Sequence, residues 1–216
     1  YGADGFRYVF PNSKTYFTWY DNFDNVIVIP DSQLGTIQIG GNVRYRGAAR
    51  MIKINTDPRT YAVAPGAILR HVTSEAVASA LYGSNWNQMI DDVPDAFFTN
   101  YTVGDPISEV DDYTLQALNA DSRNISINNN RGLVAPEEIS ITNSAYSPIS
   151  VTIEPGQTVR FTNNGTESHT ATSDDLTWGS GTMMPGRSFV RKFEEAGTYT
   201  FFDSYNSQLT GAIFVQ

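Results

Sequence analysis

Residues 139–216 are built from short runs in which apolar and polar residues alternate, separated by turn signals. Apolar side chains recur at every second position in 139–141 and 151–153, as in strands with one face buried. Pro155-Gly156 and Pro185-Gly186 are turn dipeptides between such runs. Because short strands divided by turns at this spacing are typical of a Greek-key sandwich, we predict an all-β domain here.

The same stretch carries a degenerate version of a known motif. From Ile139 onward it resembles the plastocyanin and azurin-like cupredoxin family, in which a His-Thr step supplies the first copper ligand and His169-Thr170 matches it. The other three family ligands are a Cys, a His three residues later and a Met three beyond, ahead of a Gly. Counted back from Gly211, those places hold Asp203, Asn206 and Leu209.

The residue types at these positions argue against a blue-copper centre. Such a centre needs a thiolate and two imidazoles, and this chain has no cysteine and only two histidines, His71 and His169. We therefore predict a metal-free polar cluster. Within it, Asp203 is either an exposed loop carboxylate or a hydrogen-bond partner of His169. The alternative is a site in which His169, Asp203 and Asn206 hold Cu(II), Zn(II) or Ca(II) weakly.

The N-terminal half contains a weak internal duplication, with repeats at about 1–43 and 61–106. Arg7-Tyr8-Val9 aligns with Arg70-His71-Val72, and Gly41 falls on Gly104. Each copy predicts strands, a short helix beside aromatic residues and an Asp-containing segment that leads to a glycine. The segments YVFPN, GGNV and DVPDAFF resemble duplicated repeats of exported bacterial surface proteins.

We thus predict a mainly β chain: a small duplicated α+β domain at 1–110, then a cupredoxin-like Greek-key β-sandwich at 137–216. Residues 111–136 are polar and poor in periodic apolar positions, which favours a linker or an extended arm. Within it, 121–132 could pair with a sheet edge of its own chain or of another.

Two further groups are candidates for chemistry. Asp91, Asp92 and Asp95 form a D-D-V-P-D cluster that is a weak calcium candidate, although no EF-hand spacing is present. For hydrolysis, His71 is the one candidate base in the first domain, and no G-x-S-x-G motif accompanies it. We predict that the protein is not an enzyme and has no bound cofactor. Copper is not expected, and calcium is the alternative to a cofactor-free protein.

The amino-acid composition limits the classes of partner that this protein can bind. The net charge of −9 opposes nucleic-acid binding, and no apolar run is long enough to span a bilayer. A charged fraction of 17%, no cysteine and three N-x-S/T sequons favour an extracellular or cell-surface protein. Its expected role is structural, in a filament, a layer or another assembly, through self-association or contact with other surface proteins.

Two other functions stay open at this stage. One is a metal-binding or redox cupredoxin that uses His169 and Asp203. The other is a carbohydrate-binding surface module, because residues 8–23 are dense in aromatic side chains, and such rings can stack on sugars. Aromatic residues in strands and helices are more often part of a core, so we place glycan binding last.

Overall fold

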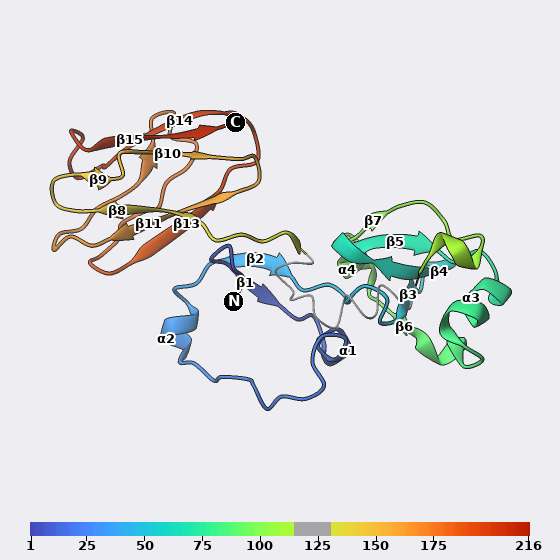
Figure 1. Cartoon of the computed structure of the whole chain (residues 1–216). Coiled ribbons are helices and arrows are strands. Elements are labelled where there is room, and N and C mark those ends of the chain that lie inside the picture. Colours follow the sequence, from blue (N-terminus) through green and yellow to red (C-terminus); the bar gives the residue numbers. More distant parts are fainter. Residues whose placement is uncertain (115–130) are drawn as a thin grey trace. The chain divides into compact units, whose positions relative to one another are not determined.

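The computed structural model describes residues 1–114 and 131–216, and it divides into two compact units (Figure 1). One unit comprises 1–7, 28–40 and 134–216, and the other comprises 8–27 and 41–133. Most of the predicted linker at 111–136, and most of the arm at 121–132, lies outside the described residues.

The first unit contains a sandwich of two four-stranded sheets (Figure 1). One sheet has the order β13-β11-β8-β9 and the other β10-β15-β14-β12. In each sheet one pair of strands is parallel, β8 with β11 and β10 with β15, and the remaining pairs are antiparallel. The strands are β8 Glu137–Ile141, β9 Tyr146–Ser147, β10 Ser150–Ile153, β11 Thr158–Asn163, β12 Thr172–Ser173, β13 Ser188–Lys192, β14 Gly197–Phe202 and β15 Thr210–Val215.

The apolar side chains of the alternating runs fill the space between these sheets. Along β11, Val159, Phe161 and Asn163 are fully buried, because every second side chain points to the same face of a strand. Phe161 and Phe201 meet edge to face with ring centroids 5.1 Å apart, so both sheets contribute aromatic rings to one core. The main core residues are Ile139, Ile141, Tyr146, Val151, Ile153, Val159, Phe161, Ala171, Trp178, Met183, Phe193, Phe201, Leu209, Ile213 and Val215.

Two short N-terminal segments belong to this unit rather than to the other. The Thr158 hydroxyl donates to the Asp4 carbonyl over 3.2 Å, and the Val190 amide donates to Gln38 Oε1 over 2.7 Å. Helix α2, Asp31–Leu34, lies in the second segment. The sequence placed all of 1–110 in one domain; the contacts instead divide it, because long-range hydrogen bonds from β11 and β13 reach these segments.

The second unit is organised around a five-stranded sheet in the order β6-β3-β4-β5-β7. Neighbouring strands β3, β4 and β5 are antiparallel, whereas the outer strands β6 and β7 run parallel to β3 and β5. Strands β1 and β2, each of which contains a point where the chain passes from one unit to the other, pair in a separate two-stranded sheet. The strands are β1 Arg7–Val9, β2 Ile39–Asn42, β3 Met51–Ile54, β4 Asp57–Ala64, β5 Ile68–His71, β6 Ile90–Asp92 and β7 Thr102–Val103.

Helices cover the five-stranded sheet on either side. The longest is α3, Glu75–Tyr82, whose buried face of Val77, Ala78 and Leu81 joins one apolar cluster. A second cluster contains Tyr45, Tyr61 and Val93. The other helices of this unit are α1 Ser13–Phe17 and α4 Asp95–Phe98, with 3-10 turns η1 Pro65–Ala67, η2 Trp86–Met89 and η3 Val110–Asp112.

The prediction of a mainly β chain is confirmed, since strand residues outnumber helical residues over the described chain. Among residues 1–114 and 131–216, no helix is long and apolar enough to cross a membrane.

Candidate functional site

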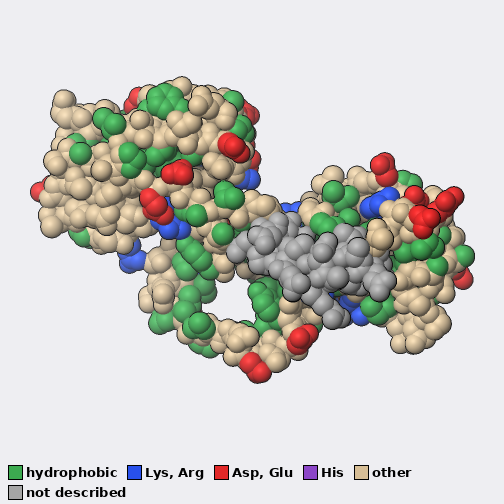
Figure 2. Space-filling model, in the orientation of Figure 1, with side chains coloured by type: hydrophobic (Ala, Val, Ile, Leu, Met, Phe, Trp, Pro, Cys, Tyr) green, Lys and Arg blue, Asp and Glu red, His purple; other side chains and the backbone are tan. Residues whose placement is uncertain are grey.

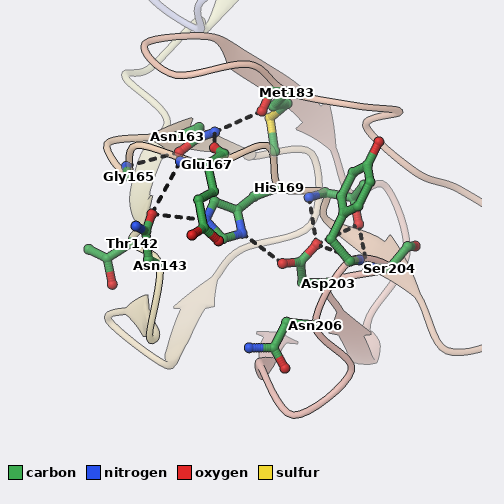
Figure 3. Close-up of polar contacts among 12 residues, drawn as sticks. Thr142, Asn143, Asn163, Gly165, Glu167, His169, Met183, Asp203, Ser204 and Asn206 are labelled. Carbon is green, nitrogen blue, oxygen red and sulfur yellow. Dashed lines mark hydrogen bonds and ion pairs between the residues drawn. The ribbon is translucent and has the colours of Figure 1, made fainter.

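His169 and Asp203 form a buried pair between two loops of the sandwich (Figure 3). The His169 Nδ1 and Asp203 Oδ2 atoms are 2.7 Å apart, and the side chains are 3% and 0% exposed. His169 is held in place by its backbone, which exchanges two hydrogen bonds with Met183. Of the two interpretations of Asp203, the structure has the buried hydrogen bond to His169 and not the exposed loop carboxylate.

The second carboxylate oxygen of Asp203 is also fully used. Asp203 Oδ1 accepts hydrogen bonds from the Thr170 amide over 2.8 Å, from the Tyr205 amide over 3.1 Å and from the Thr170 hydroxyl over 3.3 Å. Next to this group the Tyr146 hydroxyl donates to the Thr170 carbonyl over 2.6 Å. Burial, reinforced by the negative charge of Asp203, raises the pKa of Tyr146. The pocket thus forms a satisfied polar network.

The other side of the imidazole is closed by an asparagine. His169 Nε2 lies 3.4 Å from Asn143 Oδ1, which also accepts the Thr166 amide over 2.9 Å. Because Oδ1 accepts a backbone N–H, it is identified as the oxygen of the amide. A Cβ added to Gly165 would lie 3.2 Å from Nε2, so only glycine fits there without displacing a neighbour. Both ring nitrogens therefore face protein oxygens.

Asn143 and Asn163 were not among the residues that the sequence singled out. Asn163 is fully buried, and its Nδ2 donates to the carbonyls of Glu167 and Met183 over 2.8 and 2.7 Å. Its Oδ1 accepts the Gly165 amide, which fixes the loop that leads to His169. An Asn-Asn-Gly run such as 163–165 is typical of a turn, but nothing in it points toward the histidine.

The remaining two copper-ligand positions do not face His169. Asn206 is exposed, its Oδ1 accepts the Gln208 amide over 3.2 Å, and its side chain points away from the ring (Figure 3). Leu209 is buried in the sandwich core, and its carbonyl accepts the Asp203 amide. Of the three candidates beside His169, the structure brings only Asp203 into the pocket.

This donor set does not fit a blue-copper centre. One imidazole and one carboxylate replace two imidazoles and a thiolate, and the fourth position is an aliphatic side chain that cannot ligate. The Nδ1 atom is directed at Asp203 Oδ2 and the Nε2 atom at Asn143 Oδ1, so a metal ion would have to displace one of these contacts to reach a ring nitrogen. Within the described part of the chain, no three His, Cys, Asp or Glu residues converge as a metal-binding group.

Comparison with known proteins identifies the class of this domain. A family model described as a cupredoxin-like domain matches residues 116–215. The C-terminal domain is therefore cupredoxin-like, as the sequence resemblance predicted. No curated protein matches the chain.

Several solved structures are similar to the same domain. The purple cupredoxin from Nitrosopumilus maritimus is 28% identical, with a TM-score of 0.36, and the match covers 37% of this chain and 99% of that one. Amicyanin from Paracoccus versutus is 23% identical, with a TM-score of 0.35 and coverage of 38% and 81%. A copper-containing nitrite reductase from Thermus scotoductus is 18% identical, with a TM-score of 0.35 and coverage of 38% and 23%.

The three aspartates of the calcium candidate, Asp91, Asp92 and Asp95, each contact different residues. Asp91 is buried and pairs with Arg50 over 2.8 Å and with Lys14 over 3.3 Å. Asp92 pairs with Lys53, and Asp95 accepts a hydrogen bond from Thr56. Successive residues of a strand point to opposite faces, so Asp91 and Asp92 diverge. Calcium binding by these three residues stays an untested prediction.

The two remaining sequence candidates also have structural contacts. The ring of His71 is partly buried and lies 5.8 Å from that of Tyr61, as expected for a packed ring. Among the N-terminal aromatic residues, Tyr16 stacks on Phe23 at 4.6 Å, whereas Phe17 and Phe23 are each about half exposed. The expectation that these rings are core is thus only partly met, and glycan binding stays a prediction.

Proposed function

We propose that this protein is a non-catalytic structural module of an extracellular or cell-surface assembly, and that its cupredoxin-like domain works as a metal-free scaffold. In this proposal Asp203 takes over the structural role that a metal ion has in related folds. It ties the His169 loop to the end of β14, so that the sandwich stays rigid. The surfaces of the sandwich then make contacts with protein partners.

The observation that carries the proposal is the short, buried contact between His169 and Asp203, together with the donors that hold the carboxylate. Asp203 has hydrogen-bond donors on both oxygens, and His169 faces an oxygen at each ring nitrogen. A metal ion placed between the two side chains would have to break the 2.7 Å contact, while the amides of Thr170 and Tyr205 hold the carboxylate in its present position. The extracellular setting is supported by the low charged fraction and the absence of cysteine.

Metal analysis tests this scaffold function. We expect the purified chain, titrated with Cu(II), Cu(I) and Zn(II) and passed through a desalting column, to retain far less than one ion per chain by mass spectrometry. The matched variants are His169→Ala, which removes the pocket imidazole, and His71→Ala, which removes the other histidine. Retention of about one copper per chain that is lost in His169→Ala and kept in His71→Ala would overturn the proposal.

A weak metal site at His169 and Asp203 is the second candidate. The specific observation in its favour is that an imidazole nitrogen and a carboxylate oxygen lie side by side in the same pocket. Zn(II) and Cu(II) accept such borderline donors. A metal-dependent rise in melting temperature that is lost in both His169→Ala and Asp203→Asn would favour this function.

A further inference from the structure

One outer face of the sandwich carries no charged side chain. Along β10, β14 and β15, alternate residues such as Val151, Phe201 and Ile213 are buried in the core, so the residues between them point outward. Figure 2 shows mostly tan and green atoms on the visible surface over these strands. The nine outward side chains are Ser150 and Thr152 of β10, Thr210, Ala212 and Phe214 of β15, Thr198, Thr200 and Phe202 of β14, and Thr172 of β12.

The strand register places Ala212 at the centre of this face. Ala212 pairs with Ser150 on one side and with Thr200 on the other. Phe214 lies two residues farther along the same strand and is 41% exposed. Beside Ala212 there is an open hollow of about 430 Å³, and its lining includes Ser150, Thr200 and the exposed Ile149. The face therefore has both a projecting ring and a hollow.

The opposite outer face of the sandwich differs in both charge and coverage. It carries the ion pair of Glu138 with Arg160, and the two N-terminal segments of this unit pack on it. Thr158 and Val190 of that face are therefore only 2% and 6% exposed. The face without charge is thus the one that these segments leave exposed.

The composition of the uncharged face is typical of an interface. Charged side chains are the ones most often exposed in soluble proteins, whereas the core of a protein–protein interface is depleted of charge and enriched in aromatic rings. Phe202 and Phe214 are aromatic residues of this face. Asp174, the one charged residue among the described residues that line the hollow, is exposed just beyond the end of β12. Its charge therefore lies at the rim.

Charge and hydrogen bonding favour a second copy of this chain as the occupant. Two copies that each carry a net charge of −9 repel one another, and the repulsion is weakest where uncharged surfaces meet. Five of the nine outward residues are threonines and one is a serine. Because a hydroxyl can both donate and accept a hydrogen bond, the hydroxyls of two identical faces can satisfy one another.

The projecting ring and the hollow give the face a shape that fits its own copy. In a two-fold contact the same patch serves both partners, so a group of one copy can fill a hollow of the other. A two-fold axis that lies between the faces and crosses β15 at Ile213 places Phe214 of each copy over Ala212 of the other. We propose that the face formed by β10, β12, β14 and β15 is a self-association surface, on which a second copy docks with Phe214 in the hollow beside Ala212.

The size of the face predicts a weak contact. Its four strands are about 4.8 Å apart and the longest are about 20 Å long, so one copy buries about 400 Å². Two copies together bury about 800 Å², below the roughly 1,200 Å² at which stable interfaces begin. We therefore expect a dimer at high protein concentration, which an assembly with many copies stabilises through multivalency.

Sedimentation equilibrium of the parent chain, from micromolar to millimolar concentration, tests this association. We expect a reversible equilibrium between monomer and dimer that higher salt does not weaken. Salt screens the repulsion between acidic copies, and no ion pair holds the two faces together. A chain that stays monomeric up to millimolar concentration would overturn the proposal, and so would an association that salt weakens.

A charge placed beside the centre of the face provides the first variant. Thr200→Glu would bury a carboxylate in the contact, where none of the nine side chains can neutralise it, so the dissociation constant should rise at least about tenfold. Ser207→Glu adds the same charge at an exposed loop serine and should change the dissociation constant less than about twofold. Equal effects of the two variants would overturn the proposal, because net charge alone would then explain them.

Truncation of the projecting ring provides the second variant. Phe214→Ala removes the group that fills the hollow, and it should raise the dissociation constant at least about tenfold, as for an aromatic hot spot. Met184→Ala, at an apolar side chain that is 58% exposed and lies outside this sheet, is the matched control and should leave the dissociation constant unchanged. An association that Phe214→Ala leaves intact would contradict the proposed docking.

A measurement on the parent chain alone guards against variants that fail to fold. The amide resonances of isotope-labelled protein are followed by nuclear magnetic resonance as the protein concentration rises. We expect the signals of Ser150, Thr200 and Ala212 to shift, and those of Glu138 and Arg160 on the opposite face to stay in place. Shifts confined to other parts of the chain would overturn the proposal.

This inference rests on the proposed contact role of the sandwich, yet its failure differs from that of the metal-free scaffold. Retention of a metal ion by His169 would overturn the scaffold function and leave the self-association surface in place. A strictly monomeric chain that retains no metal would overturn the self-association surface and leave the scaffold function in place. Metal analysis and sedimentation of the same preparation therefore distinguish the two.

Discussion

Asp203 occupies the position at which the cupredoxin family has its thiolate ligand, and it changes what His169 can do. A cysteine there would leave the imidazole lone pair available to a metal. The carboxylate instead accepts from the ring and from two backbone amides, so that both residues serve the loop geometry. The aspartate at the family's cysteine position therefore makes His169 part of the hydrogen-bond network that holds the two loops together.

At the residue scale we predict a large cost for breaking this pair. Asp203→Ala leaves the buried His169 ring and the Thr170 amide without an acceptor, and it should lower the free energy of unfolding by about 3 kcal/mol. Urea denaturation followed by tryptophan fluorescence measures the change, because Trp178 lies in the same core. Asp174→Ala, at an exposed carboxylate, is the matched control and should change stability by less than about 0.5 kcal/mol. Equal effects would contradict the structural role.

At the scale of elements, short helices depend on their caps. The Ser74 hydroxyl accepts the Val77 amide over 3.3 Å at the start of α3, whose buried face contributes to one core of the second unit. Ser74→Ala should destabilise this unit by about 1 kcal/mol, because the amide loses its partner.

The control for the cap is Ser84→Ala, an exposed serine just beyond the end of the same helix. Thermal unfolding followed by far-ultraviolet circular dichroism compares the two variants. A melting temperature that falls equally in both would show that the cap contributes nothing specific.

At the scale of the whole molecule, buried phenols predict sensitivity to alkali. Burial raises the pKa of Tyr113 to about 12, and its hydroxyl donates to the Val63 carbonyl over 2.8 Å. Burial likewise raises the pKa of Tyr45 and of Tyr146. An unfolded chain loses these protons near pH 10, so the stabilising contribution is complete below about pH 10 and is lost as pH rises through the folded-state pKa.

The measurement is the free energy of unfolding between about pH 9 and pH 12. Each buried phenol can contribute a negative slope of at most about 1.4 kcal/mol per pH unit. Tyr113→Phe should make the decline shallower, although it lowers stability at neutral pH. Tyr205→Phe, at an exposed ring, is the substitution control, and a slope unchanged by Tyr113→Phe would contradict the prediction.

Local patterns in the sequence determined most of the sandwich. The alternation in 139–141 and 151–153 became the buried faces of β8 and β10, because strand periodicity depends only on neighbouring residues. The short helix that each repeat predicts is also present in the second repeat as α3. The family resemblance put Asp203 and His169 at ligand positions of one site, which made a contact between them one of the two expected outcomes.

The tertiary structure alone decided which distant segments belong together. Residues 1–7 and 28–40 join the sandwich unit through hydrogen bonds that span most of the chain, and Asn143 closes the His169 ring from a loop with no recognisable motif. A sequence pattern predicts which face of a strand or helix is buried. Which other elements that face packs against depends on contacts between residues far apart in the sequence, and these contacts exist only in the folded chain.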